Sequence, residues 1–245
     1  MTALPDIAPG PAAPVAERST ARARSERIYQ TLRDRICLLD YPPGARLSEE
    51  LLAAEFAISR TPLRKVLARL EAEGLIGSVH GVGTLVTDVD VEELAQVYRL
   101  RMELAPLVGK LDPIPRTAAD LDRIRAMIAE CDAIAVAGDA RAFLRLNMAF
   151  VQELNQLTGN LALREICERL YIQVARVVLK MMPELGLAAE FRAFRQEMVE
   201  VLAAAEIGDW DAIGHIRRAH ISMSFTRMLE NARARARSEG ADAEP

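Results

Sequence analysis

The sequence has few of the residues that build covalent or metal-held scaffolds. Its three cysteines, Cys37, Cys131 and Cys167, are widely spaced and form no CxxC pair. An odd number of cysteines without such a pair excludes a disulfide framework and a zinc finger, and favours a reducing, cytoplasmic setting. Because each cysteine falls among apolar residues in a helical pattern, we expect small buried side chains rather than reactive thiols.

Long apolar runs, phosphate-binding loops and catalytic constellations are also missing. No stretch approaches the roughly 18 apolar residues of a membrane span, and the Ala/Pro-rich beginning of the chain does not resemble a signal peptide. The sequence contains no Gly-rich phosphate loop, no Ser/His/Asp arrangement and no paired-carboxylate pocket. We therefore expect a protein that has no membrane partner, no cofactor and no enzymatic activity.

Positive charge gathers in one part of an otherwise acidic chain. The formal net charge is −4, but residues 18–70 hold eleven Arg or Lys against six Asp or Glu, a local balance of +5. A nucleic acid responds to the local charge of a surface rather than to the average over the chain. DNA contact is therefore expected in this region.

The most informative segment lies inside that basic region. On a helix that starts at Arg60, four apolar residues share one face, and arginines, Thr61 and Lys65 occupy the other. The apolar residues are Leu63, Val66, Leu67 and Leu70. Ser59 is a candidate N-cap, and Pro62 falls in the first turn, where a missing N–H does little harm. For the segment alone, an ordinary surface helix with solvated arginines is the alternative.

The neighbouring segments complete a winged helix-turn-helix. A helix that begins at Ser25 ends in a turn at residues 41–44, Ser48 caps a short second helix, and Gly74 ends the cationic helix. Residues 75–86 have β-prone ends around a glycine-rich middle, which predicts a two-stranded hairpin. In this fold the second helix of the motif enters the major groove and the hairpin, or wing, approaches a neighbouring groove.

Beyond residue 88 the sequence predicts helices with short loops. The expected spans are 91–110, 118–137, 140–157, 161–182, 188–207 and 210–233. The fold class is mainly α, with an N-terminal winged helix-turn-helix and a C-terminal all-α bundle of about six helices. The expected parts are a disordered arm at 1–23, the winged domain at 24–88, a helical effector-binding and dimerisation domain at 89–232 and a flexible tail at 233–245.

Three motifs resemble the GntR family of bacterial transcription regulators, specifically its FadR subfamily with an FCD-type helical domain. They are residues 43–47, 59–64 and 70–75, in the order and spacing of the family. The resemblance extends from Ser25 to about Leu229. The sequence departs from the family at Ala57, where glycine is usual, and at Lys65, where an acid is usual.

The resemblance implies that the cationic helix and the wing tip contact operator DNA. The expected DNA-binding residues are Arg46, Ser59, Arg60, Thr61, Arg64, Lys65, His80 and Gly81. Arginine reads guanine in a bidentate fashion or grips phosphate, and which of Arg60 and Arg64 does which stays open. For His80, an ordinary loop histidine is the alternative. The expected partner is a palindromic double-stranded operator bound by a homodimer.

The resemblance also implies a divalent metal in the helical domain, and here the chain departs from the family. FCD domains commonly bind the metal through an Asp and a His four residues apart on one helix, and through one His from each of two later helices. The corresponding positions are Asn147, Val151, Met198 and His220. Valine supplies no donor atom and the carboxylate charge is lost, so we expect no metal.

In place of the metal, we expect a small effector with an acidic head and an apolar body. Val151 and Met198 make the position apolar, while Asn147 and His220 remain as hydrogen-bonding groups. Arg101 matches an arginine that often faces the effector in the family and can pair with a carboxylate. The alternative is that Val151 and Met198 fill the core and that Arg101 pairs with an acid inside the bundle.

Together these expectations describe a sequence-specific DNA-binding transcription regulator, a repressor controlled by a small organic acid. Two alternatives stay open: a dimeric DNA-binding protein that needs no effector, and a metal-dependent regulator. A helical-bundle enzyme with a winged appendage has the least support, because no chemistry in the sequence accompanies it.

Overall fold

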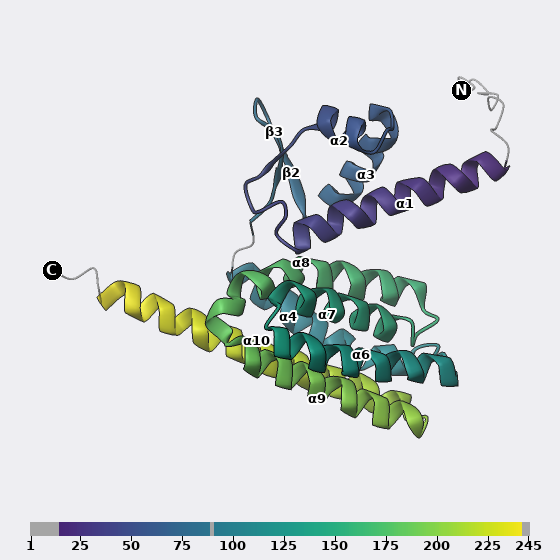
Figure 1. Ribbon diagram of the computed structural model, residues 1–245, viewed down its shortest axis with the longest axis vertical. Helices are drawn as coiled ribbons and strands as arrows, with labels where there is room; N and C mark the ends of the chain where they lie inside the picture. Colours follow the sequence, from purple (N-terminus) through teal and green to yellow (C-terminus); the bar gives the residue numbers. More distant parts are fainter. Residues whose placement is uncertain (1–14, 89–90, 242–245) are drawn as a thin grey trace, which may run out of the picture.

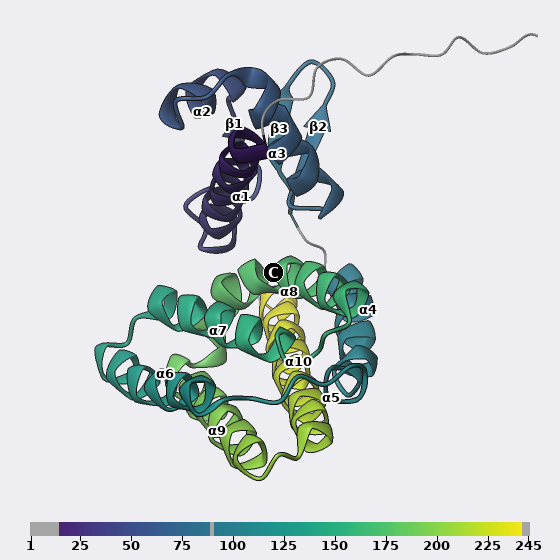
Figure 2. The same ribbon diagram turned by 90° about the vertical axis from the view of Figure 1, so that its right-hand side faces the viewer.

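A winged unit lies against one long helix of an α-helical bundle (Figures 1 and 2). The structure is a computed structural model, and it describes residues 15–88 and 91–241. Both views place helix α8 (Leu161–Leu185) on the side of the bundle that faces the winged unit. The predicted two-part, mainly α architecture is confirmed.

The winged unit contains three helices and a small antiparallel sheet. Its elements are α1 (Val15–Cys37), β1 (Arg46–Leu47), α2 (Glu49–Glu55), α3 (Arg60–Ala72), β2 (Ile76–Val79) and β3 (Gly83–Val86). The predicted hairpin is β2 and β3, in which Ile76 pairs with Val86. The sequence did not predict β1, which pairs with the other edge of β3 and gives the strand order β1-β3-β2.

The amphipathic pattern of α3 is confirmed. Its buried residues are the predicted Leu63, Val66, Leu67 and Leu70. Ser48 caps α2 by accepting a hydrogen bond from the backbone N–H of Leu51. Ser59 occupies the N-cap position of α3 with an extended backbone, but its side chain makes no capping hydrogen bond. Pro62, the third helical residue, has no N–H, which removes one of the two donors that such a cap can use.

The helical domain follows the predicted spans with one break. Its helices are α4 (Val91–Leu104), α5 (Leu107–Lys110), α6 (Ala118–Ala137), α7 (Ala140–Asn155), α8, α9 (Leu187–Glu206) and α10 (Trp210–Ala241). The single helix expected at 91–110 is two helices, because Pro106 lies between them. A side chain at Gly109 would meet the carbonyl oxygen of Trp210 at 1.9 Å, so glycine is what lets α5 cross α10 so closely.

The two ends of the chain differ from expectation. Helix α1 begins at Val15 and α10 continues to Ala241. The parts of the expected disordered arm and flexible tail at 15–23 and 233–241 are therefore helical. The remaining residues of these two predictions, 1–14 and 242–245, lie outside the described residues.

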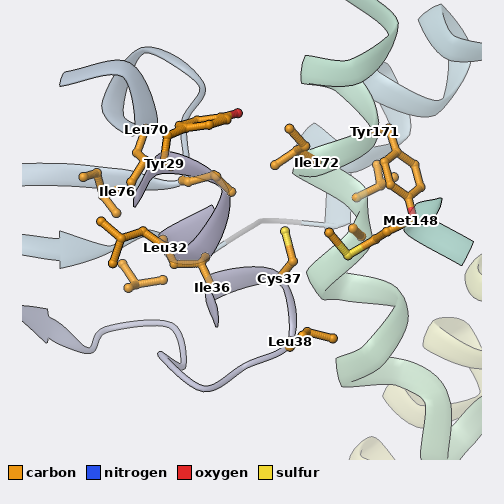
Figure 3. Packing of buried hydrophobic residues seen from close by; sticks show 14 of the residues in the cluster. Tyr29, Leu32, Ile36, Cys37, Leu38, Leu70, Ile76, Met148, Tyr171 and Ile172 are labelled. Carbon is orange, nitrogen blue, oxygen red and sulfur yellow. The ribbon is translucent and has the colours of Figure 1, made fainter. Parts of the chain in front are cut away.

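One hydrophobic cluster passes from the winged unit into the bundle, and a second lies deeper in the bundle. Figure 3 shows the first cluster where the domains meet, with Tyr29 and Leu32 on the winged side and Ile172 on α8. Cys37 lies between them and is buried, as is Cys131, while Cys167 is partly exposed. Across the described ranges, we find no helix with the length and apolarity to cross a membrane.

Candidate functional site: DNA-binding surface and buried cavity

The exposed face of α3 presents the predicted cationic residues. The side chains of Arg60 and Arg64 are 62% and 67% exposed, because the opposite face of α3 packs into the core. Each meets an acid of α2: Arg64 Nε lies 2.9 Å from Glu49 Oε2, and Arg60 Nη2 lies 3.6 Å from Glu50 Oε2. The sequence did not predict these two ion pairs, because they join different helices.

The remaining DNA-binding candidates are exposed as well. Ser59, Thr61 and Lys65 lie on or beside the first turns of α3, and His80 and Gly81 lie at the wing tip. Arg46 comes from β1, and its Nε lies 3.4 Å from the position of a side chain built on Gly83. The structure therefore places the Arg46 side chain beside the tip end of β3 in the wing, through a strand that the sequence did not predict.

The turn between α2 and α3 is held by Arg24. Arg24 on α1 donates to the carbonyl oxygens of Phe56 at 3.0 Å and Ala57 at 2.7 Å. Ala57 has φ 49°, a left-handed conformation that side chains disfavour. This explains physically why the resembled family has glycine there, since glycine adopts the conformation without strain.

The helical domain contains two adjoining cavities. They share Arg101, Tyr171, Arg217 and Ile221 on their walls. We call the first the aliphatic chamber, lined by Leu104, Val108, Val151, Leu154, Leu170 and Ile213 among others. We call the second the polar chamber, whose wall includes Asn147, Glu190, Glu197, His220 and Arg227.

Two of the three arginines at these chambers have a carboxylate partner. Arg217 Nη1 lies 2.5 Å from Glu197 Oε1, and Arg227 contacts both carboxylate oxygens of Glu190 at 2.6 and 3.0 Å. Arg101 is only 8% exposed and forms no ion pair with any carboxylate in the described part of the chain. Burial lowers the pKa of the Arg101 guanidinium, whose nearest aromatic neighbours are Tyr98 and Tyr171.

The five predicted effector residues do not all meet. Arg101 borders both chambers, Val151 lines the aliphatic chamber, and Asn147 and His220 line the polar chamber. Met198 lines neither chamber; it is fully buried in the second hydrophobic cluster with neighbours such as Phe194. Met198 therefore fills the core, as the alternative drawn from the sequence expected. Arg101 does not pair with an acid inside the bundle, which was the alternative expected for that residue.

The donor atoms near the expected metal position do not fit a divalent cation. The Asn147 amide oxygen accepts a hydrogen bond from the Tyr171 hydroxyl at 2.7 Å, and His220 Nε2 lies 2.8 Å from Glu200 Oε2. Val151 has no donor, and Met198 lies in the core. Within 15–88 and 91–241, no group of three or more His, Cys, Asp or Glu has a metal-binding arrangement.

Sequence reasoning missed several residues of this site. Arg217 lies on α10, three positions before His220, and its partner Glu197 lies on α9 beside the predicted Met198. Glu190, Arg227 and Tyr171 were not singled out either. No local signal marks them, because the pairs join different helices and become visible only when these helices pack.

Helix α8 connects the chambers with the winged domain. On one side it carries Tyr171 and Val174 at the chamber walls. On the other, Gln173 Nε2 donates to the carbonyl oxygen of Glu73, the C-cap residue of α3, at 3.2 Å. Arg176 donates to the carbonyl oxygen of Thr87 at 2.6 Å and to its hydroxyl at 3.0 Å, at the base of the wing.

A winged helix-turn-helix joined to an all-α domain with a buried cavity defines the class of regulatory DNA-binding protein. The family described as "Bacterial regulatory proteins, gntR family" matches residues 24–86, and the FCD domain matches residues 96–223. The chain belongs to the GntR family, with an FCD domain as its helical part. Its domains and relatives are those of transcriptional regulators and not of enzymes.

Two curated relatives illustrate the match. An HTH-type transcriptional regulator of Streptomyces ambofaciens is 35% identical over 58% of this chain and 60% of its own length. A probable D-xylose utilization operon transcriptional repressor of Paenarthrobacter nicotinovorans is 24% identical, covering 74% of this chain and 78% of its own. The chain spans about three fifths of the length of the first of these relatives.

Two solved structures share the fold. Escherichia coli McbR/YncC superposes with a TM-score of 0.73 at 19% identity, covering 85% of this chain and 98% of the other. A putative GntR regulator from Rhodococcus gives a TM-score of 0.67 at 20% identity, with the same coverage. At these identities the likeness establishes the fold alone.

Proposed function

We propose that the protein is a cytoplasmic, homodimeric repressor that binds a palindromic operator and is controlled by a small organic acid, without a metal. The observation that carries the proposal is the double role of α8. One side of this helix lines the chambers at Tyr171, and the other contacts the end of α3 and the base of the wing through Gln173 and Arg176.

DNA binding is assigned to α3 and the wing. Arg60 and Arg64 are exposed, and their partners Glu49 and Glu50 form surface ion pairs of the kind worth about 0 to 1 kcal/mol. A phosphate or a guanine displaces such a partner at little cost. Two α3 helices in adjacent major grooves require a dimer, which is why the operator is expected to be palindromic.

Effector binding is assigned to the two chambers. A buried guanidinium without a carboxylate partner is destabilising, and an acid that enters beside Arg101 removes that cost. A metal is not needed to hold such a ligand, and the donors at the family position do not support one. Occupancy would shift α8 at Tyr171, and α8 would then reposition α3 and the wing.

The DNA-binding half is tested with DNA from the region upstream of the protein's own gene. We expect Arg60→Ala and Arg64→Ala each to weaken binding about 5- to 150-fold, the loss of one arginine contact to a base, and affinity to fall steeply with salt. Arg195→Ala is the matched control, because Arg195 has a similar exposed ion pair on α9. Unchanged operator affinity in both α3 variants would refute the assignment.

The effector half is tested by thermal shift with a broad panel of organic acids, compared between the native chain and Arg101→Gln. We expect some acids to raise the melting temperature of the native protein and not of the variant. Protein purified without chelators should contain no stoichiometric zinc, nickel or manganese. A melting temperature unmoved by every acid would support an effector-independent DNA-binding protein, and stoichiometric metal would support a metal-dependent regulator.

A further inference from the structure

We propose that the effector is a monocarboxylate whose head lies beside Arg101 and whose apolar chain occupies the aliphatic chamber. This inference rests on the proposed function and deepens it by naming the ligand class and its orientation. Two independent features carry it: the charge balance around Arg101 and the different linings of the two chambers.

The charged side chains that border the chambers leave one positive charge without a negative partner. Three arginines and two glutamates border the chambers, and two arginine–glutamate pairs are already complete: Arg217 with Glu197 and Arg227 with Glu190. Arg101 is the cation left over. Since Glu190 and Glu197 are 6% and 5% exposed, their charges are not screened by water. One carboxylate would complete the balance, and a second would lack a free cation.

The lining decides where the rest of the ligand lies. The aliphatic chamber begins at Arg101 and continues between α4, α5, α7, α8 and α10. Besides the groups shared with the polar chamber, the polar side chains on its wall are Asn155 and Cys167, and burial raises the pKa of the Cys167 thiol, which stays neutral. A hydrocarbon chain suits this wall, because burying apolar surface is favourable by about 25 cal/mol per Å².

The same lining selects against two kinds of analogue. A dicarboxylate would place its second charge either among aliphatic side chains or beside Glu190 and Glu197, and both positions are costly. An alcohol of the same length would fill the aliphatic chamber but leave Arg101 without an anion. A monocarboxylate is the ligand that satisfies both the guanidinium and the chamber.

The test measures dissociation constants for pairs of acids that differ by one carboxylate: butyrate and succinate, hexanoate and adipate, phenylacetate and 4-carboxyphenylacetate. Hexanol serves as the neutral analogue. We expect at least one monoacid to bind at least about tenfold more tightly than its diacid partner and than hexanol. Arg101→Gln should weaken this monoacid about 10- to 150-fold, the range of a charge-assisted hydrogen bond, and Arg195→Ala should not.

A second variant tests the orientation of the chain. Val151→Phe narrows the aliphatic chamber, so the chosen monoacid should lose at least tenfold in affinity while acetate, which has no chain to place, keeps its affinity. If this variant does not fold, the ranking of the acid pairs on the native protein decides. Tighter or equal binding of the diacids, still dependent on Arg101, would overturn the monocarboxylate inference but leave the acid-controlled regulator standing. If no acid binds in an Arg101-dependent way, the proposed effector site itself fails.

Discussion

The α3 surface and the chambers use arginine in opposite ways. On α3, Arg60 and Arg64 are exposed and each has a glutamate partner on α2. At the chambers, Arg101 is buried and has no such partner among the described carboxylates. Exposed ion pairs are worth little and are exchanged easily, whereas a buried charge without a counter-ion is costly. The first arrangement suits a polyanion that displaces weak partners, and the second suits the single anion of the proposed effector.

Because of this difference, the burial of an arginine says more about whether it belongs to a binding site than the presence of an arginine does. An exposed arginine near an acid is common on any protein surface. The assignment of DNA binding to α3 therefore depends on the winged fold around it. A buried arginine facing two cavities needs a physical explanation even without a family. The two sites are joined by α8, which touches the end of α3 and the base of the wing on one side and the chambers on the other.

The largest expected effect comes from breaking that connection. In Arg176→Met, the hydrogen bonds to Thr87 are lost while an apolar side chain still fills the buried position. Operator affinity measured with and without a bound acid gives the coupling, which is typically 5- to 150-fold. We expect the variant to bind acid and DNA separately, with a coupling factor close to one.

Lys180→Ala is the matched control for this measurement. Lys180 lies on the same helix and contacts Asp88, but the side chain is 56% exposed, so its loss should leave the coupling intact. If Arg176→Met keeps the full coupling, the signal between the two sites does not pass through the contact of Arg176 with Thr87.

The sequence predicted those features of each site that lie within one segment, and it missed those that depend on the packing of separate segments. The buried face of α3 could be predicted because Leu63, Val66, Leu67 and Leu70 recur at helical spacing within one segment. The pairs of Arg60 and Arg64 with α2 could not, since they depend on how two helices pack. Strand β1 was missed because Arg46 and Leu47 make too short a segment to show alternation.

The chambers were predicted less well, for the same reason. Matching positions to the family placed Met198 at the site, but the helix turns its neighbour Glu197 toward the polar chamber and Met198 into the core. A neighbouring position on a helix is rotated by about 100°. Arg217 carried no local signal, because its partner lies on another helix. Of the residues that the resemblance suggested, Arg101 borders both chambers, Val151 lines the aliphatic chamber, and Asn147 and His220 line the polar chamber.

A smaller effect is expected at the turn that orients α3. Ala57 has φ 49°, which costs a residue with a side chain about 1 kcal/mol. Ala57→Gly should therefore raise the free energy of unfolding by up to about 1 kcal/mol, measured by urea denaturation. Ala54→Gly is the control: it lies within α2, where glycine lowers stability by a similar amount. A loss of stability in Ala57→Gly would mean that the packing around Arg24 offsets the strain.

The smallest expected effect tests whether the acids of α2 are only weak partners that DNA displaces from the arginines of α3. Glu49→Gln removes the partner of Arg64 and one negative charge near the DNA, so operator affinity should rise about 1.4- to 5-fold, the value of an exposed ion pair. Glu165→Gln removes the same charge from an exposed position on α8 and should change affinity less. Weaker operator binding in Glu49→Gln would contradict this, because it would mean that Glu49 holds Arg64 in the orientation that reads a base. The exposed arginine would then be a positioned group like Arg101, and exposure alone would not separate the two sites.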